Sequence, residues 1–149
     1  MNPELHAICQ RILDEGRQRF GAMMGIVSHV HDGSYDVMAV SSATGIPMVG
    51  DRYPLDSVYC RQVVEQGHSV AITEIDGKPG MSLHPLYDAI PCEFYLSSPI
   101  LLHDRVWGTL NYTSLDVRDT PFSAEDITYN ESRATVIAGL LTLLDTEAE

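Results

Sequence analysis

The chain is poor in positive charge. Nine Lys or Arg residues stand against 21 Asp or Glu residues, Lys78 is the single lysine, and the formal net charge is −12 at pH 7. Nucleic acids and anionic membrane surfaces are bound by clustered basic side chains that neutralise phosphates. We therefore expect no nucleic acid and no membrane as partner, and the simplest interpretation of the acidity is solubility.

Long apolar runs and regularly spaced cysteines are also lacking. The longest apolar run, near residues 136–144, is too short to cross a bilayer, and no basic segment followed by an apolar one opens the chain. Cys9, Cys60 and Cys92 are odd in number, widely spaced and form no C-x-x-C motif. Reduced thiols in a cytoplasmic protein without a signal peptide are the simplest expectation.

The segment around which the chain is organised is SSPILLHDRVWGTLNYTS, residues 97–114. Apolar residues recur there at period two on both sides of Asp104-Arg105, which predicts a hairpin with its turn at those two residues. Pro99 has no amide hydrogen and should lie at a sheet edge, a strand start or a bulge. Gly108 predicts a close approach by backbone or ligand.

The rest of the chain supplies a second hairpin and two helices. Residues 24–39 alternate around the turn signal Asp32-Gly33 and predict two paired strands. Asn2 can cap a helix that Pro3 opens and Gly21 ends, and Ser123 with Asp126 predicts the start of a final helix.

The final helix has apolar residues on two faces. One stripe is enough for packing on a sheet. The second stripe, with Val136, Leu140 and Leu143, fits either a second copy of the chain or a position between the sheet and the first helix.

The middle of the chain, residues 43–93, interrupts the two hairpins. We expect a loop over residues 41–54, a short helix from Asp56 to Gly67, a strand over residues 69–75 and a brief helical turn at residues 84–87. Long connections inside a compact domain are often functional. His29 and His31 could reach one metal from a strand, but no further nearby ligand except Asp32 presents itself, so we expect a solvated strand end and no metal site.

The order of these elements and several local motifs resemble the GAF domain family of bacterial sensor kinases and cyclases. The motifs are Tyr59-Cys60 after Pro54-Leu55-Asp56, His84-Pro85-Leu86-Tyr87, Phe94-Tyr95-Leu96, Pro99-Ile100, Gly108-Thr109-Leu110-Asn111, and Pro121-Phe122 followed by Asp126. The resemblance covers nearly the whole chain and implies a single domain over residues 1–149. It implies an α+β fold with an antiparallel five- or six-stranded sheet, terminal helices on one face, and a helical insert that covers a pocket on the other.

The resemblance also implies a function. The family mostly senses and regulates: a small ligand binds the pocket, and the terminal helices pass the change to a partner such as a histidine kinase or cyclase output domain. We expect a non-enzymatic regulatory domain, a homodimer formed through its terminal helices, and a ligand whose identity the sequence leaves unknown. A closed-pocket module that serves only dimerisation is one alternative.

A free methionine-R-sulfoxide reductase, which is a stand-alone protein of the same family, is the other alternative. It needs one cysteine to attack the sulfoxide and another to resolve the sulfenic acid. Cys60 lies in a region resembling one of that family's cysteine positions, whereas Cys92 stands in Pro-Cys-Glu and not in the family's Ala-Cys-Asp. Buried structural thiols are therefore favoured over catalysis.

Two known cofactors of the family are disfavoured by departures from its motifs. Tyr112 and Ile127 stand where cyclic GMP-binding members carry Lys and Glu. Leu83 precedes His84 where bilin-binding members carry the attachment cysteine, so covalent bilin is not expected.

The candidate ligand-binding residues lie on the insert and on the strands predicted to face it. They are Tyr59, Cys60, His84, Tyr87, Phe94 and Asn111. A pocket of this kind needs an apolar lining with a few convergent polar groups. His84 could bond an anionic or carbonyl ligand, or a backbone group at its own helix start. The aromatic residues among the six fit core packing at least as well as ligand contact.

Overall fold

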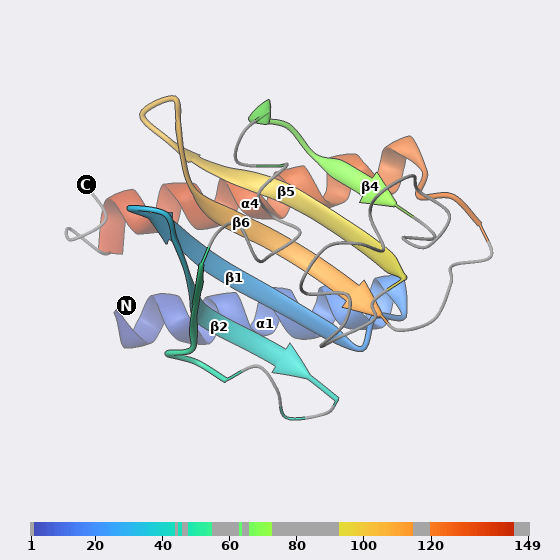
Figure 1. Ribbon diagram of the computed structural model, residues 1–149, viewed down its shortest axis with the longest axis horizontal. Helices are drawn as coiled ribbons and strands as arrows, with labels where there is room; N and C mark the ends of the chain where they lie inside the picture. The colour runs from blue at the N-terminus through green and yellow to red at the C-terminus, as the bar shows by residue number, and fades with distance from the viewer. Residues whose placement is uncertain are drawn as a thin grey trace.

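The computed structural model describes residues 2–43, 45, 48–54, 63, 66–72, 93–114 and 120–144. Six antiparallel strands form one sheet in the order β3-β2-β1-β6-β5-β4. The strands are β1 (Met24–His31), β2 (Ser34–Ser42), β3 (Arg52–Pro54), β4 (Val70–Ile72), β5 (Phe94–Leu102) and β6 (Arg105–Ser114). Helices α1 (Pro3–Phe20) and α4 (Ala124–Leu144) lie side by side on one face of the sheet (Figure 1). The predicted α+β class and the placement of the terminal helices are confirmed, whereas the predicted insert falls mostly outside the described residues.

Helix α1 begins and ends where its sequence signals predict. The Asn2 side chain accepts hydrogen bonds from the backbone amides of Glu4 (2.8 Å) and Leu5 (3.3 Å), which satisfies two of the orphan donors of the first turn. Gly21 ends the helix in the left-handed conformation, with φ of 66°. Such a C-terminal position favours glycine because it has no Cβ.

Helix α4 opens with the predicted reciprocal cap. The Asp126 amide donates to Ser123 Oγ, and the Ser123 amide donates to an Asp126 carboxylate oxygen, both at 3.0 Å. Ala134, Ile137 and Leu141 are buried against the sheet, where they join residues of α1 and the central strands in one core cluster. The second apolar stripe remains largely uncovered, since Val136 is 41% and Leu143 78% exposed.

The central hairpin is formed by β5 and β6, but its turn is one residue earlier than predicted. His103 and Asp104, with φ of 52° and 63°, make the turn, and Arg105 already pairs with Leu102. Two successive residues at positive φ match the twist of the flanking strands in a two-residue hairpin turn. His and Asp are not the glycine or asparagine residues that usually mark such a turn, which is why the turn was predicted at the wrong position.

Pro99 and Gly108 have the surroundings their chemistry requires. The pairing of β4 with β5 reaches only to Ser97, so among the described strands the stretch of β5 around Pro99 is paired with β6 alone. A residue without an amide hydrogen fits such a position. A Cβ on Gly108 would collide with the carbonyl oxygen of Ser28 on the neighbouring strand. The predicted close approach at Gly108 is therefore made by backbone.

The first hairpin is confirmed, and the segment after it corrects a prediction. Asp32 and Gly33, with φ of 51° and 74°, form the predicted turn between β1 and β2. Residues 41–54 are not simply a loop, because β2 extends to Ser42 and β3 pairs with Ser34–Asp36. The three residues of β3 end in Pro54, which an edge strand tolerates. Of the predicted strand over residues 69–75, β4 covers Val70–Ile72, and the residues after it lie outside the described ones.

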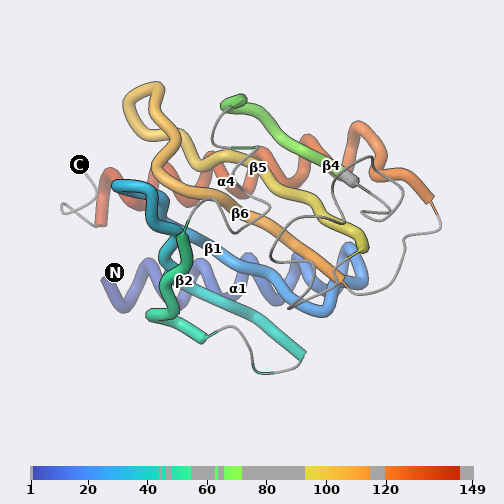
Figure 2. The backbone as a smooth tube through the Cα atoms, in the orientation of Figure 1, coloured from blue at the N-terminus to red at the C-terminus, as the bar shows by residue number. Residues whose placement is uncertain are grey.

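Both hairpin turns, the start of α1 and the end of α4 lie at the same end of the sheet (Figure 2). The Asn2 side chain donates to the carbonyl oxygen of Leu144 at 3.1 Å and ties the two helix ends together. Within the part of the chain that the structure describes, neither helix has the length and apolar character needed to span a bilayer.

Candidate functional site

The face of the sheet turned away from the helices carries a row of buried polar side chains. On β6, Leu110 and Tyr112 belong to the core beneath α1 and α4, and the Tyr112 hydroxyl donates to the Ile12 carbonyl at 3.2 Å. Because side chains alternate along a strand, Thr109, Asn111 and Thr113 project from the opposite face. All three are at most 5% exposed. They define the polar row, together with Ser28 of β1 and Tyr35 of β2.

A chain of hydrogen bonds crosses three strands within the polar row. Tyr35 Oη and Thr109 Oγ1 both donate to Asn111 Oδ1, each at 3.1 Å. Ser28 Oγ lies 2.7 Å from Thr109 Oγ1 and accepts from the Thr109 amide at 3.1 Å. Since the single Thr109 hydroxyl proton goes to Asn111, Ser28 donates to Thr109.

This arrangement orients the Asn111 amide. Two hydroxyl protons converge on Oδ1, so the donor group Nδ2 occupies the other end of the amide. A buried side chain that is held by two partners keeps one rotamer, which is the condition for a specific recognition group. The row thus holds the Asn111 amide in one orientation.

Thr113 adds a hydroxyl that the described protein does not satisfy. Its Oγ1 is buried and has no hydrogen-bond partner among the described residues, and its place on β6 is two residues from Asn111 on the same face. An unpaired buried hydroxyl costs about 1–3 kcal/mol, and each such case calls for an explanation. A bound ligand with an acceptor or donor at this point would supply one.

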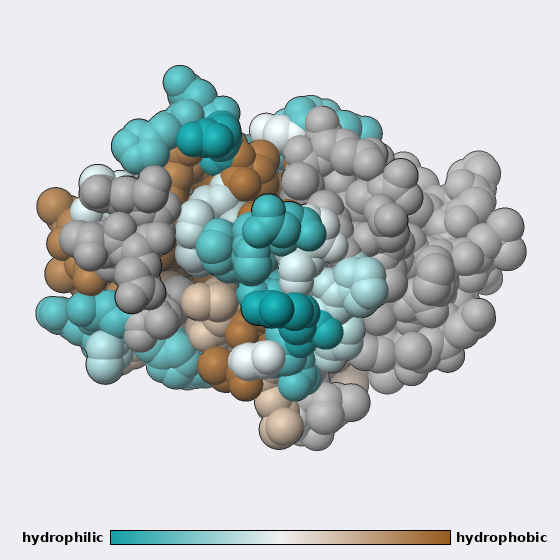
Figure 3. Space-filling model, turned by 60° about the vertical axis from the view of Figure 1, so that its left-hand side comes forward, coloured by the Kyte–Doolittle hydropathy of each residue, from teal (hydrophilic) through white to brown (hydrophobic). Residues whose placement is uncertain are grey.

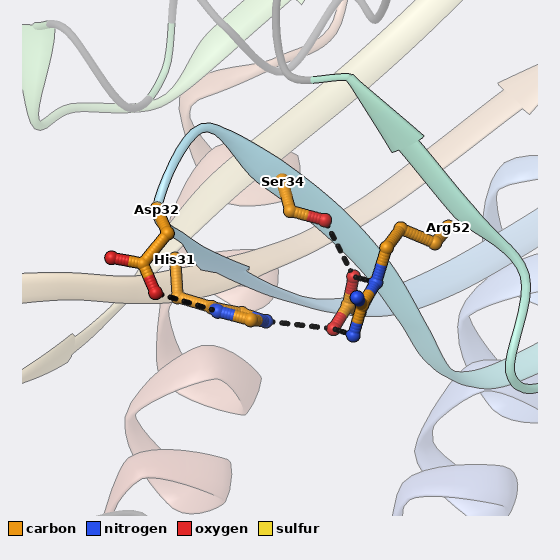
Figure 4. A network of polar contacts seen from close by, with 5 residues as sticks. His31, Asp32, Ser34 and Arg52 are labelled. Carbon is orange, nitrogen blue, oxygen red and sulfur yellow. Dashed lines mark hydrogen bonds and ion pairs between the residues drawn. The ribbon is translucent and has the colours of Figure 1, made fainter.

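A separate cluster of charges lies at the tip of the first hairpin (Figure 4). Asp36 receives His31 Nε2 at 2.7 Å, Arg52 Nε at 2.8 Å and Ser34 Oγ at 2.8 Å. Desolvation raises the pKa of Asp36, but the hydrogen bonds from His31, Arg52 and Ser34 together hold it well below its usual range. The hydrogen bond to Asp36 in turn raises the pKa of His31, against a smaller desolvation effect. The cluster joins β1, β2 and β3.

Cys9 is the only cysteine among the described residues. It is fully buried in the core, and burial raises the pKa of its thiol to about 11. A thiol of this kind stays protonated at neutral pH and does not act as a nucleophile.

A family model describes the chain over residues 4–141 as a GAF domain. The chain belongs to the GAF domain family. A search of curated protein sequences gives no significant match.

Solved structures with the same fold cover several activities. The GAF domain of PixJ from Thermosynechococcus elongatus, in its blue-light absorbing form, is similar with a TM-score of 0.71 at 21% identity, over 97% of this chain and 91% of that one. The GAF domain of a phosphoenolpyruvate-protein phosphotransferase from Coxiella burnetii gives 0.76 at 15%, over 97% and 86%. A type II free methionine-R-sulfoxide reductase from Thermoplasma acidophilum gives 0.74 at 14%, over 94% of each chain. At these identities the likeness establishes the GAF fold alone.

Two of the six candidate residues fall within the described part of this GAF domain, and they lie on opposite faces of the sheet. Asn111 is in the polar row. Phe94 is 4% exposed, belongs to the core cluster beneath the helices, and packs against Phe122 with ring centroids 5.6 Å apart. Phe94 therefore packs in the core, which was the alternative to ligand contact for the aromatic candidates. The other four, Tyr59, Cys60, His84 and Tyr87, lie outside the described residues, as does Cys92.

Sequence reasoning singled out Asn111 but missed the residues that orient it. From the sequence alone, Ser28 and Tyr35 are strand residues without a further role, and Thr109 is only part of a motif. A signal was present, because Thr109, Asn111 and Thr113 place polar residues at period two in a strand whose other face is apolar. Such alternation commonly marks a solvated face, and only burial shows that this row is enclosed.

Proposed function

We propose that this GAF domain is a non-enzymatic sensor that binds a small ligand against the polar row and signals through α1 and α4. The observation that carries the proposal is the buried, oriented amide of Asn111 beside the unpaired hydroxyl of Thr113. Such a surface suits a neutral or weakly charged ligand with both donors and acceptors, because no ionised side chain belongs to the row. The insert residues Tyr59, Cys60, His84 and Tyr87 would complete the pocket.

A route from the proposed pocket to α4 exists in the hydrogen bonds that α4 makes with β5 and β6. Asn130 of α4 is fully buried, and its Nδ2 donates to Ser98 Oγ at 2.9 Å and to the Leu110 carbonyl at 3.1 Å. Leu110 lies between Thr109 and Asn111 in sequence. A ligand that shifts the polar row would therefore move a strand to which α4 is directly bonded. In signalling members with an output domain, α4 is where such a domain would receive the change.

The exposed stripe of α4 supports a homodimer as part of the same proposal. Val136 and Leu143 are large apolar side chains that the single chain leaves in water, and an exposed apolar patch on a helix favours association. A second copy would cover the same stripe through a two-fold axis. Replacing both residues with Glu should convert a dimer to a monomer in light scattering, whereas an unchanged dimer would remove this part of the proposal.

Native mass spectrometry of the protein purified from cells, followed by gentle denaturation, tests the sensor role. A mass excess that disappears on denaturation is expected, and its value identifies the ligand class. Thr113→Val should reduce the occupied fraction, while Thr142→Val, the same change on the exposed side of α4, should leave it unaltered. An unliganded dimer that also binds nothing from a cell extract would instead favour the closed-pocket dimerisation module.

Turnover distinguishes the sensor from the reductase. The chain should show no reduction of free methionine-R-sulfoxide in the presence of a thiol reductant. If it does, Cys60→Ser and Cys92→Ser decide whether the thiols carry it, with Cys9→Ser as the matched control in a buried, protonated thiol.

A further inference from the structure

A cavity of about 190 Å³ lies at the end of the sheet that holds both hairpin turns. It is formed by the last residues of β1, the first residues of β6 and the turn between β5 and β6, and it shares no residue with the polar row. Figure 3 turns this end of the molecule toward the viewer and shows hydrophobic surface beside hydrophilic residues. The volume is below the usual range for drug-sized ligands, so any ligand here is small.

The first sign of a ligand is the indole of Trp107, the only tryptophan in the chain. The residue lines the cavity and is 8% exposed, and its ring is stacked on that of His29 with centroids 4.3 Å apart and planes inclined by 8°. Its Nε1 is buried without a hydrogen-bond acceptor among the described residues. Because Nε1 has almost no accessible surface, a ligand in the cavity would meet the ring of Trp107 and not its N–H.

The charges around the cavity point to the same kind of ligand. Arg105 and His103 line it and are exposed, and no acidic side chain is among its lining residues. Arg105 has no carboxylate within ion-pair distance in the described part of the chain. In a protein of net charge −12, a cavity that is lined by an unpaired guanidinium and no carboxylate selects for anions.

The remaining walls are apolar. Val30, Leu102 and Val106 complete the lining. They would contact the body of a ligand while Arg105 holds its charged end. Small-molecule sites commonly combine an apolar lining with a few polar groups in this way.

We propose that this cavity binds a small organic anion, a carboxylate or phosphate monoester with a short planar or apolar body. Arg105 pairs with the anionic group, and the indole ring of Trp107 contacts the body of the ligand. The inference goes beyond the proposed sensor pocket and does not depend on it. It places a ligand at the same end of the sheet as the tied ends of α1 and α4.

The single tryptophan makes a direct test available. In the ¹H–¹⁵N spectrum of the full chain, one indole resonance reports the environment of Trp107. We would titrate with benzoate, with phenyl phosphate, and with benzamide as the neutral analogue of benzoate. Saturable movement of the indole resonance by at least one anion, and none by benzamide, is expected; the two anions distinguish a carboxylate site from a phosphate site.

Two variants assign the contacts. Arg105→Gln should weaken anion binding at least about tenfold, because a charge-assisted hydrogen bond is lost. Arg11→Gln removes the same charge from an exposed position on α1 and should leave binding unchanged. Trp107→Phe, followed by calorimetry, keeps a ring against His29 but reduces the ring surface that lines the cavity, and a loss smaller than that of Arg105→Gln is expected.

Several outcomes of these experiments would contradict the proposal. No saturable movement with either anion overturns the proposal, and so does equal binding by wild type and Arg105→Gln. Movement with benzamide as large as with benzoate would show an apolar cleft without anion selectivity. Loss of the indole response in Thr113→Val would show that the two sites are one and would contradict their independence.

Discussion

The two faces of the sheet are both buried, yet they are built from different chemistry. The face beneath α1 and α4 is closed by Leu96, Ile100, Leu110 and Ile137, each with no exposed surface. The opposite face has hydroxyl and amide groups at equally buried positions. Apolar packing needs only complementary volume, whereas buried polar groups need partners with defined geometry. The first face accounts for stability, and the second is the one suited to recognition.

The largest effect should come from the helix face. Leu110→Ala removes a fully buried side chain beneath both helices, and the expected loss in free energy of unfolding is about 3 kcal/mol. Urea denaturation measures it. A loss below about 1 kcal/mol would mean that this face is not the closed core described here.

The pairing of β1 with β6 supports both faces of the sheet. A substitution at Gly108 tests how closely the two strands approach. Gly108→Ala places a Cβ against the Ser28 carbonyl, which is backbone and cannot turn aside. A loss of about 2 kcal/mol is expected. Gly139→Ala is the matched control, because its Cβ meets nothing within 4 Å, and in the interior of α4 the change should stabilise by up to about 1 kcal/mol. Equal effects of the two substitutions would contradict the close approach.

The polar face should respond in the opposite sense. Thr113→Val replaces an unsatisfied buried hydroxyl with a methyl group of similar size, so the free energy of unfolding should stay level or rise by up to about 1 kcal/mol. Ligand occupancy should fall at the same time. A clear destabilisation in thermal unfolding would mean that the hydroxyl has a structural partner. It would contradict the proposed difference between the two faces of the sheet.

The smallest effect concerns pH and the cluster at the hairpin tip. Asp36 has a lowered pKa, so its contribution to stability is present above its unfolded pKa of about 3.9 and is lost as pH falls through the folded value. His31 has a raised pKa, so its contribution is complete below about pH 6.5 and is lost as pH rises through the folded value.

Replacement of either partner should flatten this dependence. His31→Gln should remove the decline on the alkaline side, and Asp36→Asn should remove both slopes, with amplitudes below about 1 kcal/mol because the His31 side chain is 36% exposed. Thermal unfolding from pH 2 to 9 measures this. An unaltered slope between pH 6 and 8 in His31→Gln would exclude His31 as its source.

Local sequence signals sufficed for most of the fold. Asn2, Gly21, the pair Ser123 and Asp126, and the turn at Asp32-Gly33 act through hydrogen bonds and dihedral angles within a few residues, so they can be recognised in the sequence alone. The turn at His103 could not be located from the sequence, because its positive φ angles come from the hairpin twist rather than from its own residue types. Strand β3 could not be predicted from its own residues, because its pairing partner is supplied by β2.

What the sequence by itself determined is the set of elements, their caps and which side chains share a strand face, since these follow from periodicity and local geometry. The tertiary structure alone decided that Tyr35 reaches across β1 to Asn111, that the Thr113 hydroxyl is buried without a partner among the described residues, and that Phe94 belongs beneath the helices. It also decided that Trp107 and Arg105 line one cavity with His29. The physical reason is that burial and partnership depend on which strands become neighbours, and alternation along one strand does not contain that information.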